Sequence, residues 1–175
     1  AESKLFPFAY SWGYDTLSKT SEELKPQRNR LRFEFGIPEN SLVILYCGRL
    51  SVEKNLFNLL ESYHRLDHDC KSLILVGDGE LRQSLQDYVD ELGAQSVRFF
   101  GFQNRNQIGE YYSVSDLLVL PSLRETWGIV VNEAMCFGLP VIVSHQVGAG
   151  IDLVTNGQNG YNVSSDVDSL SRSIE

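Results

Sequence analysis

The chain has 175 residues, 42% of them hydrophobic, and a formal net charge of −8 at pH 7. This length and composition suit one soluble globular domain with a full core. The negative charge argues against a nucleic-acid-binding surface and against a patch that holds anionic membranes. No apolar run approaches the roughly 20 residues that a membrane-spanning helix needs, so we expect no transmembrane segment.

The first 36 residues differ from the rest of the chain. Residues 1–20 are rich in serine and aromatic side chains and show no clear period, whereas residues 26–35 have the pattern of a helix. Gly36 would end that helix. We therefore expect a linker and a leading helix over residues 1–36, followed by the main domain over residues 37–175.

From residue 37 onward, expected strands alternate with expected helices. Apolar runs predict strands over residues 42–47, 72–76, 97–100, 117–120, 141–143 and 161–163. Helical spacing predicts helices over residues 56–66, 80–92, 107–114, about 126–137 and 151–154. A last helical pattern starts near Asp166 and reaches the end of the chain, so we expect the domain to be truncated there. Near-continuous apolar strands between helices predict an α/β domain, with a parallel sheet covered on both faces.

Ligands of such sheets bind beyond the carboxyl ends of the strands. Turn and polar residues follow five of the expected strands at that edge, namely Gly48 and Arg49, Gly77 and Asp78, Gly101 and Phe102, Glu125, and Ser144 and His145. Their convergence indicates a ligand site more strongly than any single motif does. The glycines near Asp78 do not form a dinucleotide fingerprint, because Arg82 stands where the third glycine would be.

Two glutamates separated by seven residues flank one of these loops. Glu125 follows an apolar strand, and Glu133 lies on the next helix, which Thr126 would cap and Gly138 would end. The N–H groups at the start of that helix lie between the two carboxylates and favour an anion. This layout suits a nucleotide sugar, which has hydroxyls at both ends and a diphosphate in its middle. The alternative is that both glutamates only complement the helix dipole and solvate the surface.

A cationic pair follows the first strand. Arg49 offers a planar guanidinium and Lys54 a compact ammonium, and together they can hold a diphosphate. The alternative is a pair of solvated charges, with Lys54 balanced by Glu53.

Several segments, taken in order, resemble the signature of retaining glycosyltransferases of the GT-B group, family 4. The main segment contains Pro121-Ser122, Glu125-Thr126-Trp127-Gly128, Glu133-Ala134-Met135 and Gly138-Leu139-Pro140-Val141. The family's turns are matched by Gly48-Arg49-Leu50 with Glu53-Lys54-Asn55, Val76-Gly77-Asp78-Gly79, Phe100-Gly101, Gly148 and Asn159-Gly160. The resemblance covers about residues 36–165.

The resemblance implies a Rossmann-like domain that forms one half of a two-domain GT-B fold, with the active site in the cleft between the halves. This chain would be the C-terminal, donor-binding half. The N-terminal domain, which would bind the acceptor, is absent from the chain, so we expect the fragment alone to be inactive. The full enzyme would move a sugar from a UDP-, GDP- or ADP-linked donor to a hydroxyl acceptor, with retention of configuration.

The resemblance also implies roles for individual residues. Arg49 and Lys54 would neutralise the diphosphate of the donor. Glu133 would hold the ribose hydroxyls, and Glu125, the expected catalytic residue, would face the transferred sugar. The other expected donor-binding residues are Gly48, Gln103, Gly128, Ile129 and Val130.

Two other functions fit the same residues. One is a non-catalytic nucleotide-sugar-binding module that needs a partner chain, and the other is a nucleotide-sugar epimerase, which can share the fold. The chain also departs from the family at two positions. Ala149 follows Gly148 where many members have a second glycine, and Asp152 stands where glutamate is usual. The sequence therefore leaves the base, the sugar and the acceptor open.

No metal cofactor is expected, because Arg49 and Lys54 can supply the positive charge that a metal would bring. His64 and His68 have acidic neighbours, but both lie at a helix end, where a partial positive charge complements the dipole. The three cysteines show no paired spacing, which suits reduced thiols. The N-terminus lacks a signal-peptide layout, so we expect a cytoplasmic protein, with peripheral membrane attachment left open for the full-length enzyme.

Overall fold

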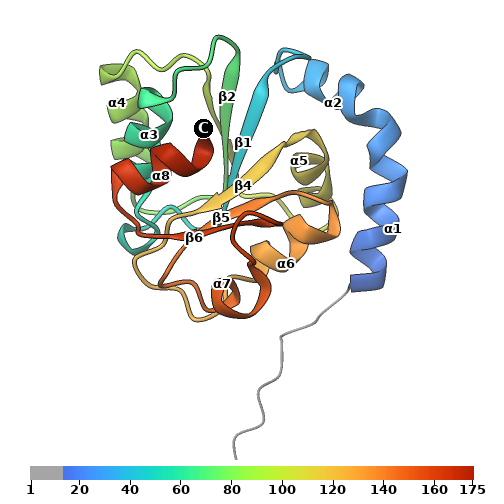
Figure 1. The fold of residues 1–175 in the computed structure, drawn as a ribbon. Coiled ribbons are helices and arrows are strands. Elements are labelled where there is room, and N and C mark those ends of the chain that lie inside the picture. Colours follow the sequence, from blue (N-terminus) through green and yellow to red (C-terminus); the bar gives the residue numbers. More distant parts are fainter. Residues whose placement is uncertain (1–13) are drawn as a thin grey trace, which may run out of the picture.

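The computed structural model describes residues 14–175, which form a six-stranded sheet with helices on both faces (Figure 1). The strand order is β3-β2-β1-β4-β5-β6, and every neighbouring pair is parallel. The strands are β1 (Leu42–Cys47), β2 (Lys71–Val76), β3 (Val97–Gly101), β4 (Leu117–Leu120), β5 (Val141–Ser144) and β6 (Gly160–Val163). This is the order of a doubly wound, Rossmann-like sheet, so the predicted parallel α/β fold is confirmed.

The helices cover the two faces of the sheet in separate groups. In Figure 1, α3, α4 and α8 lie together on one face, whereas α5 and α6 lie on the other, with α1 and α2 packed against them. The bounds are α1 (Tyr14–Leu24), η2 (Lys25–Gln27), α2 (Arg28–Glu34), η3 (Val52–Lys54), α3 (Leu56–Arg65), α4 (Arg82–Glu91), α5 (Ile108–Val114), α6 (Ile129–Cys136), α7 (Gly148–Leu153) and α8 (Val167–Ile174).

The central strands form the core because their side chains are apolar and meet helices on both sides. The side chains of residues 43–46 in β1 and 73–75 in β2 are 0% exposed. Burial of this kind is the main favourable contribution to folding. The carboxyl ends of the strands are therefore held in fixed positions, and the loops that follow them start from a rigid platform.

Most predicted elements appear within two residues of their expected ends, but α1 was not predicted. Its leucines, Leu17 and Leu24, are seven residues apart and too sparse to reveal a helical period. The helix is instead held by packing on α5 and α6, where Leu17 is buried. The predicted leading helix is split into η2 and α2, with Pro26 in the first turn of η2. The predicted linker falls largely on residues 1–13, which lie outside the described residues.

The start of α6 differs from the prediction. Thr126 does not cap the helix, which begins at Ile129 after Gly128, a residue in the left-handed region at φ 89°. The chain before it is held by neighbouring backbone instead, since the Ala149 N–H donates to the Trp127 carbonyl at 2.9 Å. Glycine suits this position because other residues rarely adopt a φ of 89°, and a Cβ would also lie only 2.9 Å from a methyl of Leu120. The predicted helix end is confirmed, with Gly138 at φ 74°.

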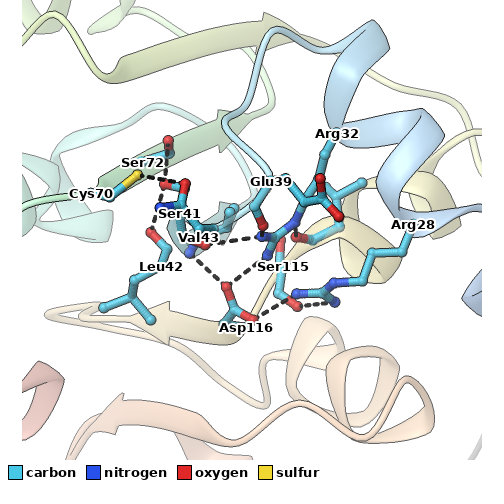
Figure 2. A network of polar contacts seen from close by, with 12 residues as sticks. Arg28, Arg32, Glu39, Ser41, Leu42, Val43, Cys70, Ser72, Ser115 and Asp116 are labelled. Atoms are coloured by element: carbon cyan, nitrogen blue, oxygen red, sulfur yellow. Dashed lines mark hydrogen bonds and ion pairs between the residues drawn. The ribbon is translucent and has the colours of Figure 1, made fainter.

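An ionic network fastens α2 to the amino ends of β1 and β4, at the edge opposite the predicted ligand site (Figure 2). Arg32, 4% exposed, donates from Nη2 to Asp116 Oδ2 at 2.8 Å and from Nε to the Val114 carbonyl at 3.0 Å. Arg28 Nη2 donates to Asp116 Oδ1 at 2.6 Å. The Val43 N–H also donates to Asp116 Oδ2, at 2.8 Å. One carboxylate therefore joins the helix to both central strands.

Candidate functional site

The loops at the carboxyl edge of the sheet pack against one another through glycines. Gly77, at φ 138°, follows β2, and a Cβ there would lie 1.8 Å from the Gly48 carbonyl oxygen. The Leu50 N–H donates to the Asp78 carbonyl at 3.0 Å, which joins the loop after β1 to the loop after β2. Only glycine permits this approach, so these turns serve to bring the two loops together.

A cavity of about 350 Å³ lies beyond the ends of β1, β2 and β3. Its lining residues are Cys47, Gly48, Arg49, Val76, Gly77, Asp78, Phe102, Gln103 and Ile108. Gln103 is held there because its Nε2 donates to the Phe100 carbonyl at 2.8 Å, and the Phe102 ring is 78% exposed at the rim. Three predicted donor-binding residues thus share one cavity. A larger cavity of about 660 Å³ lies between α1 and α5 and holds none of the predicted residues, so size alone does not mark the site.

Arg49 has a fixed backbone and an exposed side chain. The buried Tyr46 hydroxyl donates to the Arg49 carbonyl at 2.7 Å, and burial raises the pKa of Tyr46, which keeps this donor protonated. The Arg49 guanidinium lies 3.3 Å from Glu80 and its side chain is 71% exposed. An exposed ion pair of this kind contributes little, so the guanidinium can move to an arriving anion at small cost.

Lys54 pairs with Glu125, not with Glu53. Lys54 Nζ lies 2.5 Å from Glu125 Oε2, and the two side chains are only 15% and 20% exposed. Glu53 instead accepts a hydrogen bond from the Ser51 hydroxyl at 2.6 Å. The alternative of a solvated Lys54 balanced by Glu53 is therefore wrong. The structure brings together one predicted diphosphate-binding residue and the predicted catalytic glutamate.

Asn55, to which the sequence analysis gave no role beyond its place in a turn of the resemblance, follows Lys54 in the chain. It is in the left-handed region at φ 58°, and its Nδ2 donates to the Pro121 carbonyl at 3.2 Å and to the Ser165 carbonyl at 2.8 Å. These bonds tie the loop of Lys54 to the loop of Glu125. Asparagine is enriched in this backbone region, but its two hydrogen bonds join segments far apart in the chain, which no local pattern in the sequence reveals.

The start of α6 follows β4 at the same edge of the sheet, and Glu133 lies on this helix. Gly128 is buried, and Ile129 and Val130, the first helical residues, are half-buried. The N–H groups of a first helical turn have no partner within their helix and attract anions. Glu133 lies one turn further along α6, and its Oε2 accepts a hydrogen bond from the Tyr112 hydroxyl at 2.7 Å.

These groups have the chemistry that binding of a polyhydroxylated anion requires. Two cations and the N–H groups at the start of α6 can neutralise a diphosphate, and two carboxylates can accept hydrogen bonds from hydroxyls. Within residues 14–175, no group of three or more histidine, cysteine or acidic side chains could hold a metal ion. All three cysteines are free, and Cys47 lines the cavity.

A comparison of the sequence with protein families shows which family the chain belongs to. A model of the family described as glycosyl transferases group 1 matches residues 27–175. The chain belongs to this family. The match spans the complete sheet and every predicted site residue, from Gly48 to Glu133. The glycosyltransferase resemblance seen in the motifs is therefore confirmed at the level of the family.

Relatives within the family are longer than this chain. An uncharacterized glycosyltransferase of Methanocaldococcus jannaschii is 32% identical over 152 residues, which are 85% of this chain and 37% of that protein. The lipopolysaccharide 1,2-N-acetylglucosaminetransferase of Salmonella typhimurium is 30% identical over 156 residues, 82% of this chain and 40% of that protein. The chain thus spans well under half the length of the curated relatives it matches.

A solved structure supports the fold. The Anabaena protein Alr3699/HepE, crystallised in complex with UDP and glucose, superimposes with a TM-score of 0.77 at 28% identity. The superposition covers 85% of this chain and 41% of that chain. The predicted Rossmann-like fold of a GT-B glycosyltransferase is therefore confirmed. Over residues 14–175, none of the helices is both long enough and apolar enough to cross a membrane.

Tyr112, which contacts Glu133, is a residue that the sequence analysis did not name. It lies on α5, 0% exposed, and its ring stacks on Phe137 with ring centroids 5.3 Å apart. In the sequence, its position in the helical pattern predicts only a side chain that packs in the core. Its contact with Glu133 depends on how α5 packs beside α6, which no local pattern reveals.

Proposed function

We propose that this chain is the donor-binding part of a retaining, family 4 glycosyltransferase, and that a nucleotide sugar binds at the carboxyl edge of its sheet. The observation that carries the proposal is the contact of Lys54 with Glu125 beside the start of α6. A diphosphate would find a cation and helix N–H groups there, and a sugar would find a carboxylate. The UDP and glucose complex of the similar Anabaena protein supports this class of donor.

In the proposed reaction, the bond between the anomeric carbon of the sugar and the diphosphate oxygen breaks. The acceptor hydroxyl forms the new bond to that carbon on the same face, and its proton leaves with the diphosphate. Negative charge develops on the departing diphosphate, where Arg49, Lys54 and the N–H groups at the start of α6 stabilise it. Glu125 would accept hydrogen bonds from the sugar and Glu133 from the ribose.

The acceptor would be bound by an N-terminal domain of a longer, cytoplasmic protein. The chain covers 37% of the Methanocaldococcus relative, which leaves ample length for such a domain. Transfer depends on holding both reactants in one geometry. This chain would therefore bind the donor without transferring the sugar at an appreciable rate.

The proposal predicts donor binding that needs no metal. UDP-, GDP- and ADP-sugars are added to the chain at about 100 times their dissociation constants, where binding adds about 2.7 kcal/mol to the free energy of unfolding. At least one of them is expected to raise the melting temperature equally with and without EDTA, because the positive charge comes from Arg49, Lys54 and α6. A shift that EDTA abolishes and manganese or magnesium restores would contradict the metal-independent mechanism. A panel without any shift would contradict the donor site itself.

A further inference from the structure

The Tyr112 hydroxyl is buried and forms a hydrogen bond with Glu133, in which Oη lies 2.7 Å from Glu133 Oε2. Burial raises the pKa of the Tyr112 hydroxyl well above its ordinary value. The hydroxyl therefore keeps its proton at neutral pH.

Tyr112 is the donor in this contact, and Oε2 of Glu133 is the acceptor. Oε2 of Glu133 is occupied by this contact, whereas no side chain or backbone group among residues 14–175 donates to Oε1. Oε1 is thus the acceptor that Glu133 retains for a ligand.

We propose that Tyr112 is a positioning residue, which fixes the carboxylate of Glu133 so that Oε1 accepts a hydrogen bond from a ribose hydroxyl of the donor. This inference rests on the proposed function, in which Glu133 holds the ribose. The Tyr112 ring is held by its stacking on Phe137, so the core sets the position of the hydroxyl. A carboxylate that is ordered before the ligand arrives loses less conformational entropy on binding.

The test compares a ligand that has ribose hydroxyls with one that lacks them. Calorimetry measures the affinity of whichever of UDP, GDP and ADP binds the wild-type chain most tightly, and of its 2′,3′-dideoxy analogue. Tyr112→Phe is expected to weaken the ribose ligand about tenfold and to change the dideoxy ligand less than about twofold, because only the former uses Glu133. Tyr111→Phe is the matched control, since the Tyr111 ring packs on Phe35 and Phe100, and it should change neither affinity.

A double-mutant cycle separates positioning from a structural role. In the Glu133→Gln background, adding Tyr112→Phe should cost less than about twofold, because the group that Tyr112 positions has already been altered. Equal losses for both ligands, or an unchanged cost in that background, would overturn the inference and leave the proposed function intact. If Glu133→Gln binds the ribose ligand as the wild type does, or if the wild type binds none of the three, the proposed function falls and the inference with it.

Discussion

Replacing Asp116 with alanine is expected to lower the free energy of unfolding by about 2–4 kcal/mol, the largest effect on stability that we predict. The Asp116 carboxylate accepts hydrogen bonds from Arg28, Arg32 and the Val43 N–H, and Arg32 is only 4% exposed. Loss of the Asp116 carboxylate leaves the buried Arg32 guanidinium without its counter-ion. We place the effect at the lower part of the range for buried ion pairs, because the Asp116 side chain itself is 35% exposed.

Equilibrium unfolding in urea measures this loss. The matched control is Asp168→Ala, which removes a carboxylate from Arg65 at 3.0 Å, in a pair where the Asp168 side chain is 78% exposed. That variant should unfold at nearly the same urea concentration as the wild type, because exposed pairs contribute little. If Asp116→Ala were no more destabilised than the control, the network of Figure 2 would not be what fastens α2 to the sheet.

Glu133→Gln is expected to weaken nucleoside diphosphate binding by about 1.5–3 kcal/mol, which is the usual free-energy contribution of a hydrogen bond to a charged group. The side chain keeps its size, so the change acts through the carboxylate. The proposed partner of Glu133 is the ribose, which every nucleoside diphosphate carries. Calorimetry with UDP, GDP and ADP gives the affinity, and thermal unfolding checks that the variant is folded.

Glu125→Gln is the matched control for this measurement. Its proposed partner is the transferred sugar, so nucleoside diphosphate binding should persist. It should even tighten, by up to about fivefold, because Lys54 loses the carboxylate that lies 2.5 Å from its Nζ. The preference for the whole nucleotide sugar should fall. The assignment of the two glutamates is reversed if Glu125→Gln abolishes nucleoside diphosphate binding while Glu133→Gln leaves it unchanged.

The fold could be predicted from the sequence because buried parallel strands are continuous apolar runs. Residues 42–47 and 117–120 lie in the middle of the sheet, and both strands appear at their predicted ends. Helix α1 could not be predicted, because packing on α5 and α6 stabilises it and Leu17 and Leu24 give only a weak pattern. Thr126 has the chemistry of a cap, but its segment is held outside the helix by hydrogen bonds from Gly148 and Ala149, the first residues of α7, to the carbonyls on either side of it.

The site residues could be proposed from the sequence, but their contacts could not. Lys54 has an acidic neighbour in Glu53, yet its partner is Glu125, 71 positions along the chain. Such a pair forms only when the ends of β1 and β4 lie side by side. The contact between Tyr112 and Glu133 likewise requires two helices to meet. Both contacts are consequences of strand order, which hydrophobic patterns do not specify.

The central claim is that the donor binds at the carboxyl edge of this sheet, and an NMR titration tests it most directly. The wild-type chain, labelled with ¹⁵N, is titrated with the nucleotide sugar that gives the largest thermal shift. We predict that the amide signals that move are those of Gly48 and Arg49, of Gln103, and of residues 128–133. Signals around Asp116, at the opposite edge, should stay in place. Movement centred on Asp116, or no movement at saturating ligand, would contradict the account.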